Sequence, residues 1–186
     1  MISLLIGTNR PGSSSRKIGA ELESIYAELG VSLNVIDLAG LPPEIFSTGS
    51  YAEKPDSFAP FRQAVLDADG LIVVTPEYNS GMPGVLNYFI DMLPFPESFE
   101  RRPVCFVRCA AGMWGALRPV EQLQQIFGYR NAHIFPERVF IPGVMGLLGE
   151  AGKLTDESIV GRLAEQAKGF LKFVEKLNPG SSHEAA

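Results

Sequence analysis

The chain has 186 residues, of which 46% are hydrophobic and 20% charged, and its formal net charge is −5. This length predicts one globular domain over residues 1–178 with a sizeable core, and a polar, disordered tail over residues 179–186. The acidic balance argues against nucleic acid as a partner, and no apolar run is long enough for a membrane-spanning helix. Residues 1–6 lack the basic segment of a signal peptide, so we expect a cytoplasmic protein.

Five short apolar runs read as strands, at residues 2–6, 33–38, 71–74, 104–107 and 139–141. Apolar runs without a polar face suit strands that are covered on both sides, as in a parallel sheet. Residues 39–54 are long for a loop and are expected to have a functional or interface role.

Between these runs, apolar residues recur at helical spacing, at residues 18–29, 58–68, 85–93, 117–127 and 159–177. Gly30 lies where a helix would end, and Thr155-Asp156 lie where the last helix would begin. Strands alternating with helices through right-handed crossovers predict an α/β fold, a doubly wound five-stranded parallel sheet with helices on both faces.

The loop after the first strand, residues 7–16, is rich in glycine, serine and arginine. It matches neither the dinucleotide fingerprint nor the P-loop motif. Backbone N–H groups at a helix start, hydroxyls and one arginine instead suit a terminal phosphate monoester. The candidate ligands are Thr8, Arg10, Ser13, Ser14 and Ser15. The alternative is a serine-rich N-capping loop that binds nothing, but an arginine has no capping role there.

The loop after the third strand, residues 75–84, is a turn cluster at a strand's carboxyl end. It can present backbone groups to a flat ligand, with Tyr78 or Pro76 as a stacking or edge surface. The alternative is a plain turn in which Pro83 begins a helix. Glu77 has no partner histidine or second carboxylate in the motif, so we expect a capping or interface role rather than a catalytic base.

Cys105 and Cys109 are the two cysteines, which excludes a disulfide scaffold and a four-cysteine zinc site. On one strand their side chains would point the same way, ~13 Å apart, so no disulfide is expected. Cys105 is predicted to lie in the core. Cys109 could instead be a reactive thiol at the site. His133 and His183 form no metal-binding group, so no metal is predicted.

The motifs Gly-Thr-Asn-Arg-Pro-Gly-Ser at 7–13 and Thr-Pro-Glu-Tyr-Asn at 75–79, continuing to Pro83-Gly84 and Asp91, resemble the NAD(P)H-dependent FMN reductase family. That flavodoxin-like group includes quinone, chromate and azo-dye reductases, and the resemblance covers residues 2–177. It implies that the first loop holds the FMN phosphate, through Thr8, Arg10, Ser13 and Ser15 with Ser14 beside them. It also implies that Pro76, Glu77, Tyr78 and Asn79 line the isoalloxazine edge, with Ser80 beside them.

The resemblance extends to the third loop, residues 108–118, where Gly112, Gly115 and Arg118 match the family pattern. Cys109 and Ala116 replace a serine and a glycine there. The glycines would let the backbone approach the pyrimidine end of the flavin; alternatively, they serve turn geometry alone. Trp114 would cover the flavin or fill a dimer contact. Departures at Gly81, Asn87-Tyr88 and Met92 leave oligomer contacts and substrate preference open.

By resemblance, FMN carries the reaction and no side chain is catalytic. A nicotinamide, NADH or NADPH, would pass hydride to flavin N5. The reduced flavin would then pass electrons to a small-molecule acceptor: a flavin, a quinone, an azo compound or a metal ion. Arg16 and Lys17 could assist a phosphate. A homodimer or homotetramer is implied, with the helix after Pro83 and residues 93–96 as candidate interface. The alternative is a flavodoxin-type electron carrier. Arg10 and the modest net charge argue against that alternative.

Overall fold

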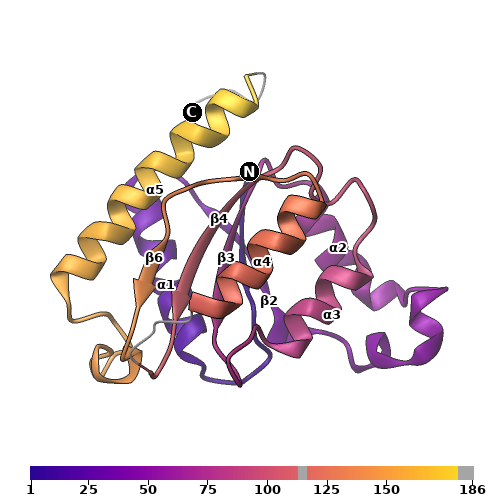
Figure 1. The fold of residues 1–186 in the computed structure, drawn as a ribbon, viewed down its shortest axis with the longest axis horizontal. Coiled ribbons are helices and arrows are strands. Elements are labelled where there is room, and N and C mark those ends of the chain that lie inside the picture. Colours follow the sequence, from indigo (N-terminus) through magenta and orange to yellow (C-terminus); the bar gives the residue numbers. More distant parts are fainter. Residues whose placement is uncertain (113–116, 180–186) are drawn as a thin grey trace.

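The computed structural model describes residues 1–112 and 117–179, which form one parallel sheet between two layers of helices (Figure 1). The strand order is β2-β1-β3-β4-β5, and β6 also pairs with β4. All the carboxyl ends therefore point toward one edge of the sheet, at the bottom of Figure 1. The strands are β1 (Ile2–Ile6), β2 (Leu33–Asp37), β3 (Gly70–Pro76), β4 (Pro103–Cys109), β5 (His133–Ile134) and β6 (Val139–Ile141).

The five predicted strands are present, but the last position in the sheet is shared by two strands. Pro103, at the start of β4, pairs with His133 of β5, and Val107, further along β4, pairs with Val139 of β6. The prediction of five strands is corrected in this respect, because the two residues of β5 are too few to show a periodicity in the sequence.

The helices divide between the two faces of the sheet as the alternating strand residues require. On one face, Leu4 and Val107 pack with α1 and α5; on the other, Leu5 and Phe106 pack with α2, α3 and α4. The flavodoxin-like, doubly wound arrangement is thus confirmed. The helices are α1 (Ser14–Glu28), α2 (Ala59–Leu66), α3 (Gly84–Met92), α4 (Leu117–Tyr129) and α5 (Glu157–Leu177).

Local capping sets where the two helices of the first face begin and end. The Ser13 hydroxyl accepts the N–H of Arg16, so α1 starts four residues before its predicted apolar stripe. Gly30, at a φ of 77°, ends α1 with its N–H on the Ala27 carbonyl. Asp156 caps α5, as the sequence predicted.

The segment expected as a long loop at residues 39–54 folds into short 3-10 helices instead. They project from the body of the molecule beside α3, at the lower right of Figure 1. They are η1 (Leu38–Gly40), η2 (Pro43–Phe46) and η3 (Thr48–Tyr51), and η4 (Asp56–Phe58) follows just before α2. A further short 3-10 helix, η5 (Val144–Gly146), follows β6.

At the end of the chain, α5 stops at Leu177, and residues 180–186 of the predicted tail lie outside the described residues. No helix in residues 1–112 or 117–179 combines the length and the apolar character that crossing a bilayer requires.

The cap of α5 provides a test of how local hydrogen bonds stabilise the helices of the first face. The Asp156 carboxylate accepts the N–H groups of Ser158 and Ile159 at 2.9 and 3.1 Å. Asp156→Ala is expected to lower the free energy of unfolding by about 1 kcal/mol, because these N–H groups lose their acceptor. Asp156→Asn keeps an acceptor and is expected to lose less. Urea denaturation checks both values, and equal losses in the two variants would contradict the cap.

Candidate active site

A cavity of about 310 Å³ lies at the carboxyl edge of the sheet. It is lined by residues 10–15 and 17 after β1, 76–78 at the end of β3, 109–111 at the end of β4, and 144–145 after β6. In doubly wound sheets, ligands bind at this edge, where the connections from neighbouring strands diverge to opposite faces. The three loops that the sequence singled out therefore meet at one place.

The first loop presents hydrogen-bond donors to the cavity. The first N–H groups of a helix have no intrahelical acceptor, and those of Ser14 and Ser15 show no acceptor within the described residues. The Ser15 hydroxyl lies 3.4 Å from the Cys109 sulfur on the cavity floor. Arg10 is exposed at the cavity mouth and forms no ion pair there with any described residue.

The two basic residues at the start of α1 have different surroundings. Arg16 points away from the cavity and pairs with Glu23 at 2.6 Å and Asp37 at 3.6 Å. The expectation that Arg16 assists a phosphate is therefore corrected, because acidic neighbours already engage its guanidinium. Lys17 lines the cavity, with the carbons of its side chain beside Gly152.

The second loop is a tight turn whose outer residues do not reach the cavity. Tyr78 and Gly81 exchange N–H···O bonds of 3.0 Å, and Asn79 and Ser80 between them have φ angles of 52° and 61°. Positive φ at both central residues is the type I′ geometry. Pro76, Glu77 and Tyr78 line the cavity, whereas Asn79 and Ser80 are exposed at its rim.

Helix α4 holds the turn from outside. The Met82 N–H donates to the Gln122 amide oxygen at 2.9 Å, and Arg118 Nη1 lies 3.4 Å from the Ser80 hydroxyl. Arg118 Nη1 is also 3.7 Å from Glu77 Oε1. These contacts fix the turn against the first turn of the helix.

Glu77 carries a buried acceptor that the protein leaves unused. Its side chain is 16% exposed, and Oε2 is buried with no hydrogen-bond partner among the described residues. Glu77 lines the cavity and shows no capping hydrogen bond among the described residues, while an interface role stays a prediction. A buried carboxylate oxygen without a donor is costly, so this atom suits a ligand that brings an O–H or N–H group.

Beside Glu77 lies a buried arginine that the sequence analysis missed. Arg108 is fully buried on β4 and stacks on the ring of Phe140. Its pKa is lowered to about 9, mainly by burial and also by the nearby Arg138, while Glu121 and Glu77 act in the opposite direction. The guanidinium is thus protonated at neutral pH. Its signal in the sequence is a single charge inside an apolar run.

The third loop contributes less than expected. Cys109 is buried at the cavity floor, and burial raises the pKa of its thiol to about 11, partly opposed by the Ser15 hydroxyl. A protonated, buried thiol is unreactive, so the reactive-thiol interpretation is not supported. Cys105 is core and both thiols are free, as predicted. Gly112 does not line the cavity, and Trp114 and Gly115 lie outside the described residues.

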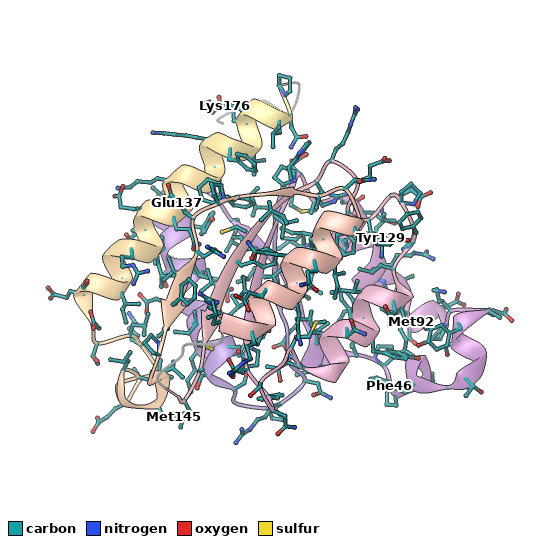
Figure 2. The ribbon with its side chains drawn as sticks, viewed as in Figure 1. Phe46, Met92, Tyr129, Glu137, Met145 and Lys176 are labelled. Carbon is teal, nitrogen blue, oxygen red and sulfur yellow. The ribbon has the colours of Figure 1, made fainter. Side chains whose placement is uncertain are left out.

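The loop after β6 adds a fourth wall that sequence reasoning missed. Val144 and Met145 line the cavity, and the Ser14 hydroxyl donates to the Met145 sulfur at 3.4 Å. Met145 is labelled at the lower edge of Figure 2, where the strands end. The rule that ligands bind at strand carboxyl ends, applied to residues 142–145, would have found it.

A larger groove, about 570 Å³, lies between the start of β6 and α5 and does not show these features. Charges of both signs line it, from Glu137, Arg138, Arg162 and Glu165. It lies away from the converging strand ends. The described residues also contain no group of three or more histidine, cysteine, aspartate or glutamate side chains placed to hold a metal ion.

The cavity residues fit FMN in their chemistry. Unused N–H groups, hydroxyls and two cationic side chains suit a phosphate. The free acceptor of Glu77 suits a ribityl hydroxyl or a ring N–H. Pro76, Tyr78 and Ala111 offer apolar surface for a flat ring.

Comparison with known proteins supports the same assignment. The sequence profile of the family described as NADPH-dependent FMN reductase matches residues 1–145. A 2-hydroxy-1,4-benzoquinone reductase from Burkholderia sp. is 36% identical over 131 residues, 69% of this chain and 70% of its own length. A quinone reductase from Escherichia coli (strain K12) is 26% identical over 180 residues, 93% of this chain and 94% of its own.

The fold has solved counterparts as well. The structure of FerB, a flavoenzyme NAD(P)H:(acceptor) oxidoreductase from Paracoccus denitrificans, superimposes with a TM-score of 0.76 at 21% identity. The match covers 94% of this chain and 97% of that one. A profile match over residues 1–145 of 186, with a relative at 36% identity, establishes the family. The chain belongs to the NADPH-dependent FMN reductase family and is an oxidoreductase that uses FMN and a reduced nicotinamide.

Proposed function

We propose that the cavity at the carboxyl ends of β1, β3 and β4 is the FMN site, with the phosphate at the start of α1. One observation carries the proposal: Ser14 and Ser15, whose N–H groups are unused, line the same cavity as Arg10 and Lys17. A helix N-terminus with free N–H groups and nearby cations is an anion site. Glu77 Oε2 then accepts a hydrogen bond from a ribityl hydroxyl or a ring N–H.

Bound FMN supplies the redox chemistry, taking hydride from NADH or NADPH and giving it to an acceptor. The side chains bind and orient, and none has to act as an acid or base. The cavity, about 310 Å³, is at the small end of ligand pockets, which span roughly 300–1,000 Å³. It therefore encloses part of a flavin nucleotide and leaves the remainder open to a second reactant.

The proposed acceptor is a quinone. The support is that relatives at 36% and 26% identity are named for benzoquinone and quinone reduction. Free flavins, azo compounds and oxidised metal ions are further acceptors within the proposal. A flavodoxin-type carrier would share the FMN site but would not accept electrons from a nicotinamide.

We propose that the protein is located in the cytoplasm, where both buried cysteines would stay free thiols. With a net charge of −5 at pH 7, neither nucleic acid nor an anionic membrane surface is among the proposed partners.

The proposal includes a homodimer, or a tetramer built from such dimers. Phe46 and Tyr51 are 49% and 55% exposed, and their rings meet Tyr88 of α3 at centroid distances of 5.2 and 5.7 Å. We call this exposed cluster the aromatic face. Exposed aromatic clusters of this kind mark association sites, and this one includes the helix after Pro83 that the sequence proposed as interface.

The phosphate site is tested by removing its arginine. Arg10→Ala is expected to weaken FMN binding roughly 10- to 100-fold, because a charge-assisted hydrogen bond contributes about 1.5–3 kcal/mol. Titration of the apoprotein with FMN, followed by quenching of flavin fluorescence, measures the change. Arg162→Ala is the matched control, since Arg162 lines the groove beside α5.

Two results would contradict the proposal. Equal FMN affinity in wild type and Arg10→Ala, or a loss confined to Arg162→Ala, would remove the phosphate from this cavity. Rapid mixing of the FMN-loaded protein with NADPH and NADH tests the reaction itself. Loss of flavin absorbance, and its return on adding 1,4-benzoquinone, is expected; an unchanged spectrum with both nicotinamides would favour the carrier.

The dimer is tested on the aromatic face. The double variant Phe46→Ser/Tyr51→Ser is expected to shift the protein from dimer to monomer, because the apolar contact area is removed. Light scattering during size-exclusion chromatography gives the mass. Tyr129→Ser is the control, since Tyr129 is even more exposed, at 78%, but lies at the far end of α4 (Figure 2). A monomeric wild type, or dissociation by Tyr129→Ser alone, would contradict this assignment.

A further inference from the structure

A side-chain hydrogen bond directly joins the loop after β1 (residues 7–16), which we call the phosphate loop, to the loop after β3 (residues 75–84), which we call the ring loop. The Thr8 hydroxyl lies 2.9 Å from the Tyr78 hydroxyl, across 70 residues of sequence. Thr8 is 1% exposed, so water does not compete well for this contact. The sequence suggested Tyr78 as a stacking surface, but its phenol oxygen is directed at the phosphate loop.

On the phosphate side, Thr8 determines how the loop leaves β1. The Thr8 hydroxyl accepts the N–H of Arg10 at 3.3 Å. Just before it, the Gly7 N–H donates to the Val74 carbonyl at 2.9 Å. Arg10 is otherwise exposed and forms no ion pair with a described residue. The Thr8 hydroxyl is therefore the contact through which the conformation around Arg10 is set.

On the ring side, Tyr78 belongs to a turn that cannot easily move. Its backbone exchanges two hydrogen bonds with Gly81, and α4 holds the turn through Gln122 and Arg118. The phenol thus extends from a fixed turn to a loop with few other restraints. In this arrangement the turn, which several contacts hold, positions the loop after β1.

We propose that Tyr78 is a positioning residue for the phosphate half of the FMN site. Acting through Thr8, its hydroxyl holds residues 8–12 in the conformation that presents Arg10 and the helix N–H groups to a phosphate. The proposal rests on the proposed FMN site. What is new is that affinity for the FMN phosphate depends on Tyr78, a residue of the loop after β3 rather than of the loop that contacts the phosphate.

The experiment compares FMN with riboflavin, which lacks the phosphate. Apoprotein is titrated with each flavin by fluorescence quenching, for wild type, Tyr78→Phe, Thr8→Val and the double variant. Tyr78→Phe is expected to bind FMN roughly five-fold more weakly, as expected for the loss of one hydrogen bond. Thr8→Val is expected to lose at least as much, because it also removes the acceptor of the Arg10 N–H. Both single variants are expected to bind riboflavin within two-fold of wild type. The double variant is expected to lose no more than Thr8→Val alone, because the bond that Tyr78→Phe removes is already absent in Thr8→Val.

Two controls keep a structural effect apart from a positioning effect. Tyr88→Phe removes a phenol that donates to the Ile45 carbonyl, away from the ligand loops, and is expected to leave the FMN-to-riboflavin affinity ratio unchanged. Thr8→Ser keeps the hydroxyl and is expected to retain most of the FMN affinity. Circular dichroism confirms that each variant is folded.

Other outcomes would overturn the inference. Equal weakening for FMN and riboflavin would mean that Tyr78 serves the ring alone. Weaker FMN binding in Tyr78→Phe but not in Thr8→Val would mean that the phenol reaches the ligand directly. Additive losses in the double variant, or no loss in either single variant, would also exclude coupling. A wild type that binds the two flavins equally well would reject the phosphate site itself, whatever the variants do.

Discussion

The pairing of β1 with β3 is the constraint on which the site depends. The chain leaves β1 for α1 on one face of the sheet, and leaves β3 for α3 on the other, so the two connections diverge and open a crevice. At the mouth of that crevice, Gly7 donates its N–H to the Val74 carbonyl at 2.9 Å. A Cβ at Gly7 would stand 2.9 Å from a Leu86 methyl and 3.1 Å from that carbonyl oxygen, so glycine permits this close approach.

The chemistry of the crevice differs from the average of the chain. The protein is acidic overall, yet the cavity is lined by the start of α1, Arg10 and Lys17. Glu77, which lines the cavity and has one buried oxygen without a partner, lies close enough to the buried Arg108 to raise the pKa of that guanidinium. The proposed anion site is thus a local arrangement of donors, and the redox step belongs to the flavin.

Much of this arrangement could be predicted from sequence. Apolar runs identify buried parallel strands, and parallel strands bring their following loops to one edge, so residues 7–16 and 75–79 had to be neighbours. The rest depends on tertiary packing. No pattern distinguishes the buried Arg108 from an exposed one, shows that Asp37 and Glu23 engage Arg16, or turns Asn79 away from the cavity. The wall at Met145 depends equally on how the loop after β6 folds back.

The central claim is that the loops after β1, β3 and β4 form one site with a phosphate end and a ring end. A crystal structure of the protein grown with FMN tests it most directly. The account predicts phosphate oxygens within hydrogen-bond distance of the Ser14 and Ser15 N–H groups, with the ring against residues 76–78. FMN in the groove between β6 and α5, or in the cavity with its phosphate directed away from α1, would contradict it.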